Sequence, residues 1–281
     1  MTPIDPELRI AAVRLAVSDL PASTDFYTRV LGLALLDGDG QRSLLGAGAE
    51  AALELTALER AMAIPAGSTG LFHVAWLHPS RAALAETVRR VGASGWPITG
   101  AADHGVSEAI YLDDPDGLGI EIYADRPREL WERPADGHGV RMVTLPLDIE
   151  DLLAQSPGAP PAAVAEGTGI GHVHLKVADV ARSDSFYRGL GFEEQAQLPS
   201  AAFVSAGGYH HHVGLNSWQS AGGAPAGEHA PGLRHVRFSL SGEPAVEALT
   251  AVAGAAGAIE RENGTLRLRD PDGHELRFSA A

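Results

Sequence analysis

The chain has 281 residues and no cysteine, which excludes disulfides, thiolate nucleophiles and zinc–cysteine sites. Its net charge of −15 repels phosphate backbones and anionic lipids, so we expect neither nucleic acid nor a membrane as a partner. No apolar run reaches the roughly 18 residues of a transmembrane helix, and the first residues lack the pattern of a secretory signal, so we expect a cytoplasmic protein.

The first half of the chain contains two strand–helix segments. Residues 10–20 alternate apolar and polar side chains as a strand does, and residues 22–32 follow as an amphipathic helix that a glycine ends. A second strand is predicted over 70–77 and a second helix over 80–91. The second of these segments is followed by an Asp-Pro-Asp-Gly turn at 114–117. Pro-Asp-Gly is typical of the tight turn of a hairpin.

The second half repeats the first almost position for position. Residues 170–191 match the strand and helix at 10–32, and Phe186-Tyr187 corresponds to Phe26-Tyr27. A strand over 232–240, a helix and a second Asp-Pro-Asp-Gly turn complete the repeat. Self-similarity at this spacing predicts four β-α-β-β-β modules, which we number 1 to 4 and place at residues 9–57, 70–125, 169–217 and 232–279.

The modules suggest a division of the chain into two pairs. We expect an N-terminal pair within 1–125 and a C-terminal pair within 169–281, joined by a linker over 126–168. The linker is rich in proline and carries one short predicted helix at 147–153. One module cannot bury the concave face of its curved sheet, so two modules must lie side by side and enclose a cleft. The predicted fold is therefore α+β, with four βαβββ modules paired into two curved mixed sheets.

This repeat resembles the vicinal oxygen chelate superfamily, which includes glyoxalase I and the extradiol ring-cleavage dioxygenases. The resemblance covers all four modules. Residues 104–121 further resemble a signature of extradiol enzymes of the catechol 2,3-dioxygenase type: a His, then an apolar residue and a Tyr, the Asp-Pro-Asp-Gly turn and a Glu. The resemblance implies that Tyr111 hydrogen-bonds the substrate and that His104 is a donor beside it.

In this superfamily the metal ligands come from the first and last strands of paired modules. Alignment of the first strands gives four equivalent positions: Ala12, His73, His172 and His235. Alignment of the turns places Glu121 of module 2 opposite Arg277 of module 4, where a cation would repel a metal ion. The resemblance thus implies a metal site of His73, Glu121 and His172. Two His and one carboxylate form the facial triad of non-haem Fe(II) oxygenases, so we expect Fe(II), with Mn(II) as an alternative.

The resemblance also implies an acid–base histidine in module 3, where the chain reads His210-His211-His212. The register of the family favours His211. If the run is a strand, His210 and His212 face the opposite side, and His212 remains a candidate for the cleft at a ligand position. The other histidines, which have no motif around them, are interpreted as surface or turn residues: His78, His138, His229 and His274.

The resemblance implies an Fe(II)-dependent extradiol dioxygenase that inserts both atoms of O2 into a catechol-type substrate and yields a ring-opened semialdehyde. A glyoxalase-type isomerase or lyase is one alternative; it needs a second carboxylate ligand, which Glu54 supplies if modules 1 and 2 pair. A metal-free ligand-binding protein is another. The triad itself requires modules 2 and 3 to pair, either within one chain or between subunits of the homo-oligomer that we expect.

Overall fold

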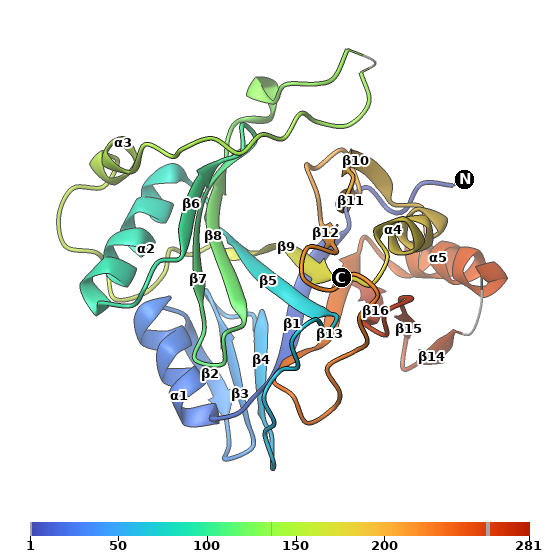
Figure 1. Cartoon of the computed structure of the whole chain (residues 1–281), viewed down its shortest axis with the longest axis horizontal. Coiled ribbons are helices and arrows are strands. Elements are labelled where there is room, and N and C mark those ends of the chain that lie inside the picture. The colour runs from blue at the N-terminus through green and yellow to red at the C-terminus, as the bar shows by residue number, and fades with distance from the viewer. Residues whose placement is uncertain (1, 136, 257–258) are drawn as a thin grey trace.

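The protein is described by a computed structural model that covers residues 2–135, 137–256 and 259–281. These residues form two eight-stranded mixed sheets, covered by helices on their outer faces (Figure 1). The strand orders are β14-β15-β16-β13-β1-β4-β3-β2 in the first sheet and β10-β11-β12-β9-β5-β8-β7-β6 in the second. The predicted α+β fold with two curved mixed sheets is confirmed.

Each module begins with a strand and a helix and continues with three strands. Module 1 contains β1 (Arg9–Val17), α1 (Leu20–Asp25), a π-helical turn (Phe26–Val30), β2 (Ala34–Gly38), β3 (Arg42–Gly46) and β4 (Leu53–Ala57). Module 2 contains β5 (Gly70–Leu77), α2 (Arg81–Ser94), β6 (Gly100–Asp103), β7 (Ser107–Asp113) and β8 (Gly119–Asp125).

The second half of the chain has the same order of elements. Module 3 contains β9 (Gly169–Lys176), α4 (Val180–Gly189), β10 (Glu193–Leu198), β11 (Ala201–Ser205) and β12 (Val213–Asn216). Module 4 contains β13 (Gly232–Leu240), α5 (Glu243–Ala256), β14 (Glu260–Glu262), β15 (Thr265–Arg269) and β16 (Glu275–Ala280). The connection between the halves holds a short 3-10 helix (Arg128–Leu130) and α3 (Ile149–Ala154).

The helices start where the sequence provides capping side chains. Asp19 accepts a hydrogen bond from the backbone N–H of Ala22 at the start of α1, and Asp179 does the same for Arg182 at the start of α4. These caps satisfy N–H groups that have no partner within the helix. The repeat in the sequence is therefore also a repeat of local structure.

The modules pair across the two halves of the chain. β5 of module 2 runs antiparallel to β9 of module 3, and β1 of module 1 runs antiparallel to β13 of module 4. Figure 1 shows modules 1 and 2 on one side of the molecule and modules 3 and 4 on the other, with these four strands crossing between them. Modules 2 and 3 thus pair within one chain, which settles the alternative that the sequence left open.

The Asp-Pro-Asp-Gly turns tie neighbouring modules of each half together. The hydroxyl of Tyr27 in module 1 donates to Asp114 of the module 2 turn at 3.2 Å. The hydroxyl of Tyr187 in module 3 donates to Asp270 of the module 4 turn, also at 3.2 Å. The repeated Phe-Tyr motif therefore links modules that belong to different sheets.

The segment between the halves is packed onto module 2. Leu152 of α3 is fully buried, and the Arg89 guanidinium of α2 donates to the carbonyl oxygens of Leu153 and Ser156. The short helix predicted near 147–153 is confirmed as α3, with a small shift in its bounds. An isolated bridge between Asp103 and Leu145 brings the start of the segment beside β6.

Two histidines interpreted as surface or turn residues are buried: His274, which does follow a turn, and His78, which is almost fully enclosed. The Nε2 atom of His78 lies 2.9 Å from the hydroxyl of Thr87 on α2, and its Nδ1 lies 3.1 Å from the carbonyl oxygen of Trp76. Burial lowers the pKa of His78 to about 4. This interpretation was wrong because the partner of His78 comes from the helix that packs over the end of β5.

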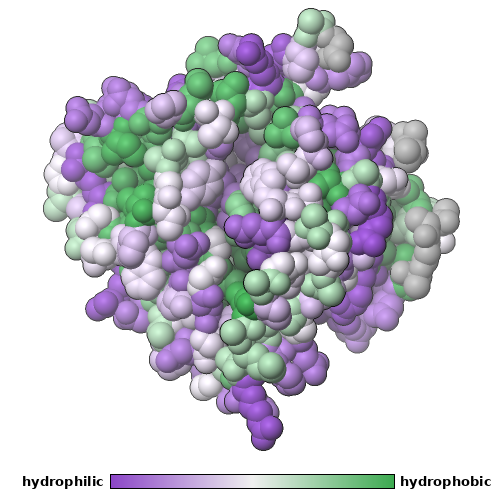
Figure 2. All heavy atoms as spheres, viewed as in Figure 1, coloured by the Kyte–Doolittle hydropathy of each residue, from purple (hydrophilic) through white to green (hydrophobic). Residues whose placement is uncertain are grey.

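The visible face of the molecule mixes hydrophilic and hydrophobic residues in small groups (Figure 2). In the described part of the chain no helix is both long and apolar enough to cross a membrane.

Candidate metal centre

The predicted metal ligands come from three adjacent strands of the second sheet. His73 lies on β5, Glu121 on β8 and His172 on β9. β5 lies between the other two strands, and its residue Ala75 is paired with Glu121 on one side and with His172 on the other. Because alternate residues of a strand face the same side, all three side chains project onto the concave face of the sheet.

The three side chains converge on one point. His73 Nε2 lies 3.0 Å from Glu121 Oε2 and 3.3 Å from His172 Nε2, and His172 Nε2 lies 3.2 Å from the same carboxylate oxygen. Ligand atoms about 2.1 Å from a shared ion are about 3.0 Å apart at 90° and about 3.4 Å apart at the tetrahedral angle. The observed spacings fall in this range, and these residues form a cluster able to hold a metal ion.

The electrostatics of the cluster keep its ligands in the forms that bind metals. Burial alone would raise the pKa of Glu121, but the charge and hydrogen bonds of His172 and His73 outweigh it and hold that pKa well below the usual range. Burial lowers the pKa of His172 to about 4 although the Glu121 carboxylate opposes the shift. Near neutral pH the site therefore offers a carboxylate and a neutral imidazole, as metal coordination requires.

A fourth protein ligand is missing from the centre. The parallel pairing of β9 with β12 places Gly214 opposite His174, the position that corresponds to Glu121 in module 2. A Cβ atom at Gly214 would lie 2.8 Å from the ring of His174. His212 does not occupy this position. The centre therefore has three protein ligands in the described residues and leaves the cavity side open.

Tyr111 and His104 lie together beside the cluster, as the extradiol signature implies. The Tyr111 hydroxyl is 2.7 Å from His104 Nε2, and His104 Nδ1 is 2.8 Å from the carbonyl oxygen of Val143. Burial, and then the negative charge of Glu121, raise the pKa of Tyr111 well above its usual value. Tyr111 is thus a neutral donor, 5.8 Å from the His73 ring by centroids.

The His210–His212 run is a bend rather than a strand. β12 begins only at Val213, and two glycines with positive φ, Gly207 and Gly208, turn the chain before it. All three imidazoles are buried. The alternation that was expected to put His210 and His212 on one face and His211 on the other therefore does not apply.

The three histidines of the run occupy different places. The ring of His211 packs 4.0 Å from that of His172 and lines the cavity. His210 Nδ1 lies 2.8 Å from His211 Nδ1, and His210 Nε2 lies 2.9 Å from Asp125. His212 points away from the cavity, and its Nδ1 accepts a hydrogen bond from the backbone N–H of Ala206.

A cavity of about 490 Å³ opens in front of the cluster. Its walls are mainly apolar and come from both paired modules and from the connection between the halves: Phe72, Ala102, Met142, Val143, Leu198, Phe203 and Trp218. This volume lies within the usual range for small-molecule sites. The segment predicted as a linker therefore contributes to the wall of the site.

Sequence reasoning missed two features of this site. His174 lines the cavity, and its ring lies 5.0 Å from that of His73. It stands two residues after His172, so strand periodicity alone places it on the same face. The contact between Asp125 and His210 had no comparable signal because the two residues are 85 positions apart.

The equivalent positions in the first sheet carry different side chains. The pairing of β1 with β4 sets Arg14 opposite Glu54, and the pairing of β13 with β16 sets Arg237 opposite Arg277. Glu54 and Arg277 thus correspond to Glu121 by position, and Glu54 lies 3.6 Å from the Nε atom of Arg14. Glu54 belongs to the other sheet and is not available to the triad.

The fold and this centre define the class of protein, and comparison with known families agrees. The family model of the Glyoxalase/Bleomycin resistance protein/Dioxygenase superfamily matches residues 9–122 and 169–278. The chain belongs to this superfamily.

Individual relatives narrow the assignment. The chain is 40% identical to the "Catechol-2,3-dioxygenase" of Bacillus subtilis, with 96% of each chain covered. It is 30% identical to the "Lactoylglutathione lyase" of Escherichia coli O157:H7 over 42% of its own length and 94% of that protein. The first relationship confirms the prediction that the chain is an enzyme of the extradiol dioxygenase type.

Solved structures share the fold at low sequence identity. A putative dioxygenase from Bacillus subtilis superposes with a TM-score of 0.66 at 15% identity, over 99% of this chain and 86% of that one. Glyoxalase I from Zea mays superposes with a TM-score of 0.57 at 18% identity, over 97% and 92%. These likenesses establish the fold alone.

Proposed function

We propose that the protein is an Fe(II)-dependent extradiol dioxygenase that uses O2 to open the ring of an uncharged catechol. The observation that carries the proposal is the convergence of His73, Glu121 and His172, with the Tyr111–His104 pair and His211 around the same cavity. The overall change balances without a further reductant: both atoms of O2 enter the catechol, and one ring C–C bond breaks to give an acid and an aldehyde or ketone.

His73, Glu121 and His172 would hold the iron. The donor set supports this choice because two imidazoles and one carboxylate on one face suit Fe(II) and leave positions open toward the cavity. When bound, the ion would supply adjacent sites for the diol and O2 and a path for electrons between them. Mn(II) fits the same donors and remains the alternative metal.

His211 is the proposed acid–base group, and its hydrogen bonds select its tautomer. The Asp125 carboxylate accepts from His210 Nε2–H, so the Nδ1 of a neutral His210 must accept. The nearby Nδ1–H of His211 then donates to it, which leaves the lone pair of His211 Nε2 for a substrate proton. Burial, and then the charges of His172 and His210, hold the pKa of His211 well below its usual value, which favours this neutral form.

In this proposal His211 Nε2 takes a proton from a diol hydroxyl and later returns it within the cavity. On the other side, His104 Nδ1–H donates to the Val143 carbonyl, so the Nε2 of a neutral His104 accepts from the Tyr111 hydroxyl in the free protein. In the proposal this hydroxyl turns from His104 to donate to the reacting oxygens when substrate binds. The apolar walls exclude water, which strengthens these interactions during the reaction. Each of these roles rests on this chain's own side chains.

The cavity lining supports an uncharged substrate. Neither Lys nor Arg is among the described residues that line it, and the one carboxylate belongs to Glu121. A carboxylate on the substrate would lose its hydration without a cationic partner, which is costly. Catechols with apolar substituents would instead contact Phe72, Phe203 and Trp218.

A glyoxalase-type reaction is less well supported. That chemistry needs a second carboxylate ligand from the paired module, and the corresponding position holds Gly214. The nearest candidate, Glu54, lies in the other sheet. The cavity instead contains histidines and a tyrosine, which suit proton transfer to and from a diol.

The test is product identification with iron-loaded protein, catechol and O2. We expect O2 uptake equal to the catechol consumed and the visible absorbance of a ring-opened semialdehyde. Comparison of 4-methylcatechol with 3,4-dihydroxybenzoate should give kcat/KM at least about tenfold higher for the uncharged diol. No O2 uptake would refute the dioxygenase, an intradiol product would refute extradiol cleavage, and a preference for the acid would refute only the substrate class.

A further inference from the structure

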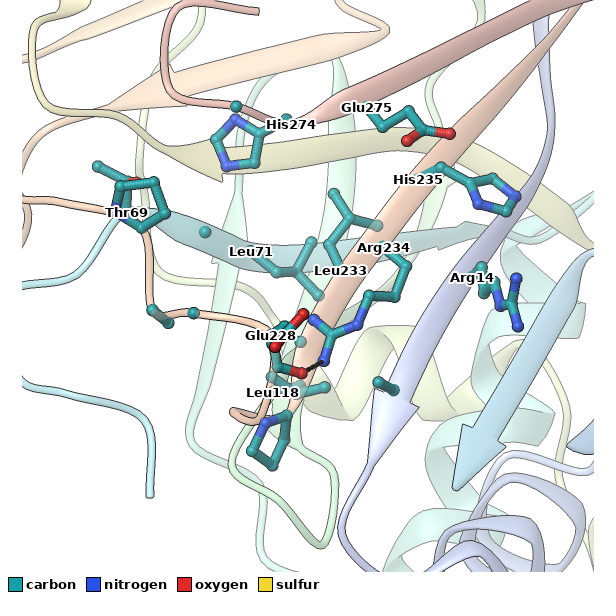
Figure 3. Close-up of a pocket in the computed structure, with 18 of the residues that line it drawn as sticks. Arg14, Thr69, Leu71, Leu118, Glu228, Leu233, Arg234, His235, His274 and Glu275 are labelled. Carbon is teal, nitrogen blue, oxygen red and sulfur yellow. Dashed lines mark hydrogen bonds between the residues drawn. The ribbon is translucent and has the colours of Figure 1, made fainter. Parts of the chain in front are cut away.

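A second, larger cavity lies on the concave face of the other sheet. It has a volume of about 750 Å³ and is formed by β1, β4, β13 and β16, the start of β5, the end of β9 and residues 225–231 (Figure 3). It contains no member of the metal centre. It occupies the place in the first sheet that the centre occupies in the second, because His235 corresponds to His73 and Arg277 to Glu121.

The charged lining of this cavity is mainly cationic. Five cations, Arg14, Lys176, Arg234, Arg269 and Arg277, face three carboxylates, Glu228, Asp272 and Glu275. An excess of positive charge in a concave surface concentrates anions. This excess is notable in a chain whose net charge is −15.

Two of the carboxylates are already engaged by other groups. Asp272 accepts hydrogen bonds from Arg182 and Ser183, neither of which lines the cavity. Glu275 is shared between Arg269 at 2.8 Å and Arg277 at 2.6 Å. The carboxylates therefore do not neutralise the remaining cations of the cavity.

Arg234 and Lys176 form no ion pair with the described residues, although the charge of the Glu228 carboxylate partly offsets that of Arg234. The Arg234 guanidinium donates to the backbone oxygens of Glu228 and Ala230, each at 2.8 Å, which fixes its position without an ion pair (Figure 3). The side chain of Lys176 has no ion pair or hydrogen bond among the described residues and is partly buried at the end of β9. A half-buried cation without a counterion is costly unless an anion binds to it.

Polar atoms without partners lie in the same wall. Arg14 Nε, Thr69 Oγ1 and His274 Nε2 are buried and have no hydrogen-bond partner in the described part of the chain. Buried polar atoms are nearly always satisfied in folded proteins, so a group of such atoms lining one cavity points to a polar ligand. Arg14 Nε, whose nearest carboxylate is Glu54 at 3.6 Å, and the Thr69 hydroxyl can donate to an oxyanion. The Nε2 of a neutral His274 would instead accept from a ligand hydroxyl or amide, because its Nδ1–H donates to Asp270.

The remaining lining is apolar and would suit the body of an organic molecule. Leu71, Leu118 and Leu233 lie among the charged groups (Figure 3), and Ile64 also lines the cavity. We propose that this cavity is a second ligand site, separate from the metal centre, that binds an organic anion: a carboxylate group held by Arg234 and Lys176, with an apolar body against these leucines. The proposal does not depend on the dioxygenase reaction.

The test is calorimetric titration of the full-length, iron-loaded protein with benzoate, and with benzamide as an uncharged molecule of the same shape. We expect saturable benzoate binding in the micromolar to millimolar range, weakened by added salt, and binding of benzamide at least about tenfold weaker. Arg234→Gln and Lys176→Gln should each weaken benzoate binding by about tenfold. Arg9→Gln, which removes a cation from β1 outside the cavity, should leave it unchanged.

Two further readouts separate the possible outcomes. Lys176→Gln removes no internal hydrogen bond, so it stays informative even if Arg234→Gln disturbs residues 225–231. Benzoate binding that is unchanged in Lys176→Gln and lost in Glu121→Gln would place the ligand at the metal centre and overturn the proposal. No benzoate binding at about 10 mM would also overturn it, whereas catechol cleavage would be unaffected by either result.

Discussion

The two sheets of this protein have the same architecture but opposite site chemistry. In the second sheet, the side chains of His73, His172 and Glu121 converge, and neither Lys nor Arg is among the described residues that line the cavity in front of them. In the first sheet the corresponding positions hold Ala12, His235, Glu54 and Arg277, and the surrounding side chains are mainly cationic. The same scaffold thus presents a cluster able to hold a metal ion on one concave face and a mainly cationic cavity on the other.

This difference shows that replacing a few side chains can change the chemistry of a site while the fold around it stays the same. Strand pairing, helix caps and the turn contacts of Tyr27 and Tyr187 are repeated in both halves. The side chains that line the two concave faces are among the features that differ. Function therefore follows from those positions and not from the architecture.

The largest expected effect comes from removing the carboxylate of the metal centre. Glu121→Gln keeps the size of the side chain but removes its charge. Partners that merely orient metal ligands contribute about 10–100-fold to affinity, so loss of this ligand should weaken iron binding by more than about 100-fold and abolish turnover. Glu54→Gln, at the corresponding position of the first sheet, is the matched control. Metal analysis should find iron lost only in Glu121→Gln; equal loss in both variants would contradict the comparison.

A smaller effect is expected from His211→Ala, which should spare iron binding. Acid–base groups contribute about 10²–10⁴-fold to rate, so turnover should fall by that factor. His212→Ala, from the same run but facing away from the cavity, should change turnover by no more than a few-fold. The measurement is steady-state kinetics on the iron-loaded variants. A larger loss of turnover in His212→Ala than in His211→Ala would make His212 the acid–base group.

Tyr111→Phe should have a more modest effect on catalysis. The variant removes one hydrogen bond and keeps the ring. If the hydroxyl acts mainly after substrate binds, kcat and kcat/KM should fall together by roughly tenfold, with KM little changed. A rise in KM at constant kcat would show instead that Tyr111 only helps the substrate to bind.

The turn contacts should affect stability without affecting the metal. Tyr27→Phe removes the side-chain donor of Asp114 Oδ2, while backbone N–H groups still donate to its Oδ1. Tyr187→Phe removes the corresponding donor of Asp270 Oδ2, which keeps a contact with His274 Nδ1. Each variant should lower the free energy of unfolding by about 1–2 kcal/mol, measured by urea denaturation, with iron content unchanged. Because His274 still contacts Asp270 Oδ2, the loss should be the smaller of the two in Tyr187→Phe; no loss of stability in either variant would contradict the role given to these contacts.

No effect on iron is expected from His235→Ala. Burial, and then the charge of Arg277, lower the pKa of His235 to about 4, so the residue is a neutral imidazole beside a cation. Iron content and turnover should match the unchanged protein within error. Loss of iron in this variant would mean that the first sheet also holds a metal.

The internal repeat is the reason that the fold and the candidate metal ligands could be predicted from the sequence. It made residues of different modules equivalent, so the fold and the set of His73, Glu121 and His172 followed from alignment and family resemblance. Module pairing did not follow, because a connection as long as 126–168 permits several arrangements.

Local deviations from the repeat could not be predicted from the sequence either. The register of His210–His212 was misjudged since Gly207 and Gly208 bend the chain and shorten the strand to Val213–Asn216. The burial of His78 depends on a partner in α2 that a strand pattern cannot reveal.

The most direct test of the account is to locate the iron. Crystals of protein loaded with Fe(II) under anaerobic conditions should be measured at the iron absorption edge. We predict one anomalous peak per chain, about 2.0–2.2 Å from His73 Nε2, His172 Nε2 and an oxygen of Glu121. A peak beside His235 in the first sheet, or no peak at the His73 cluster after loading, would contradict the account.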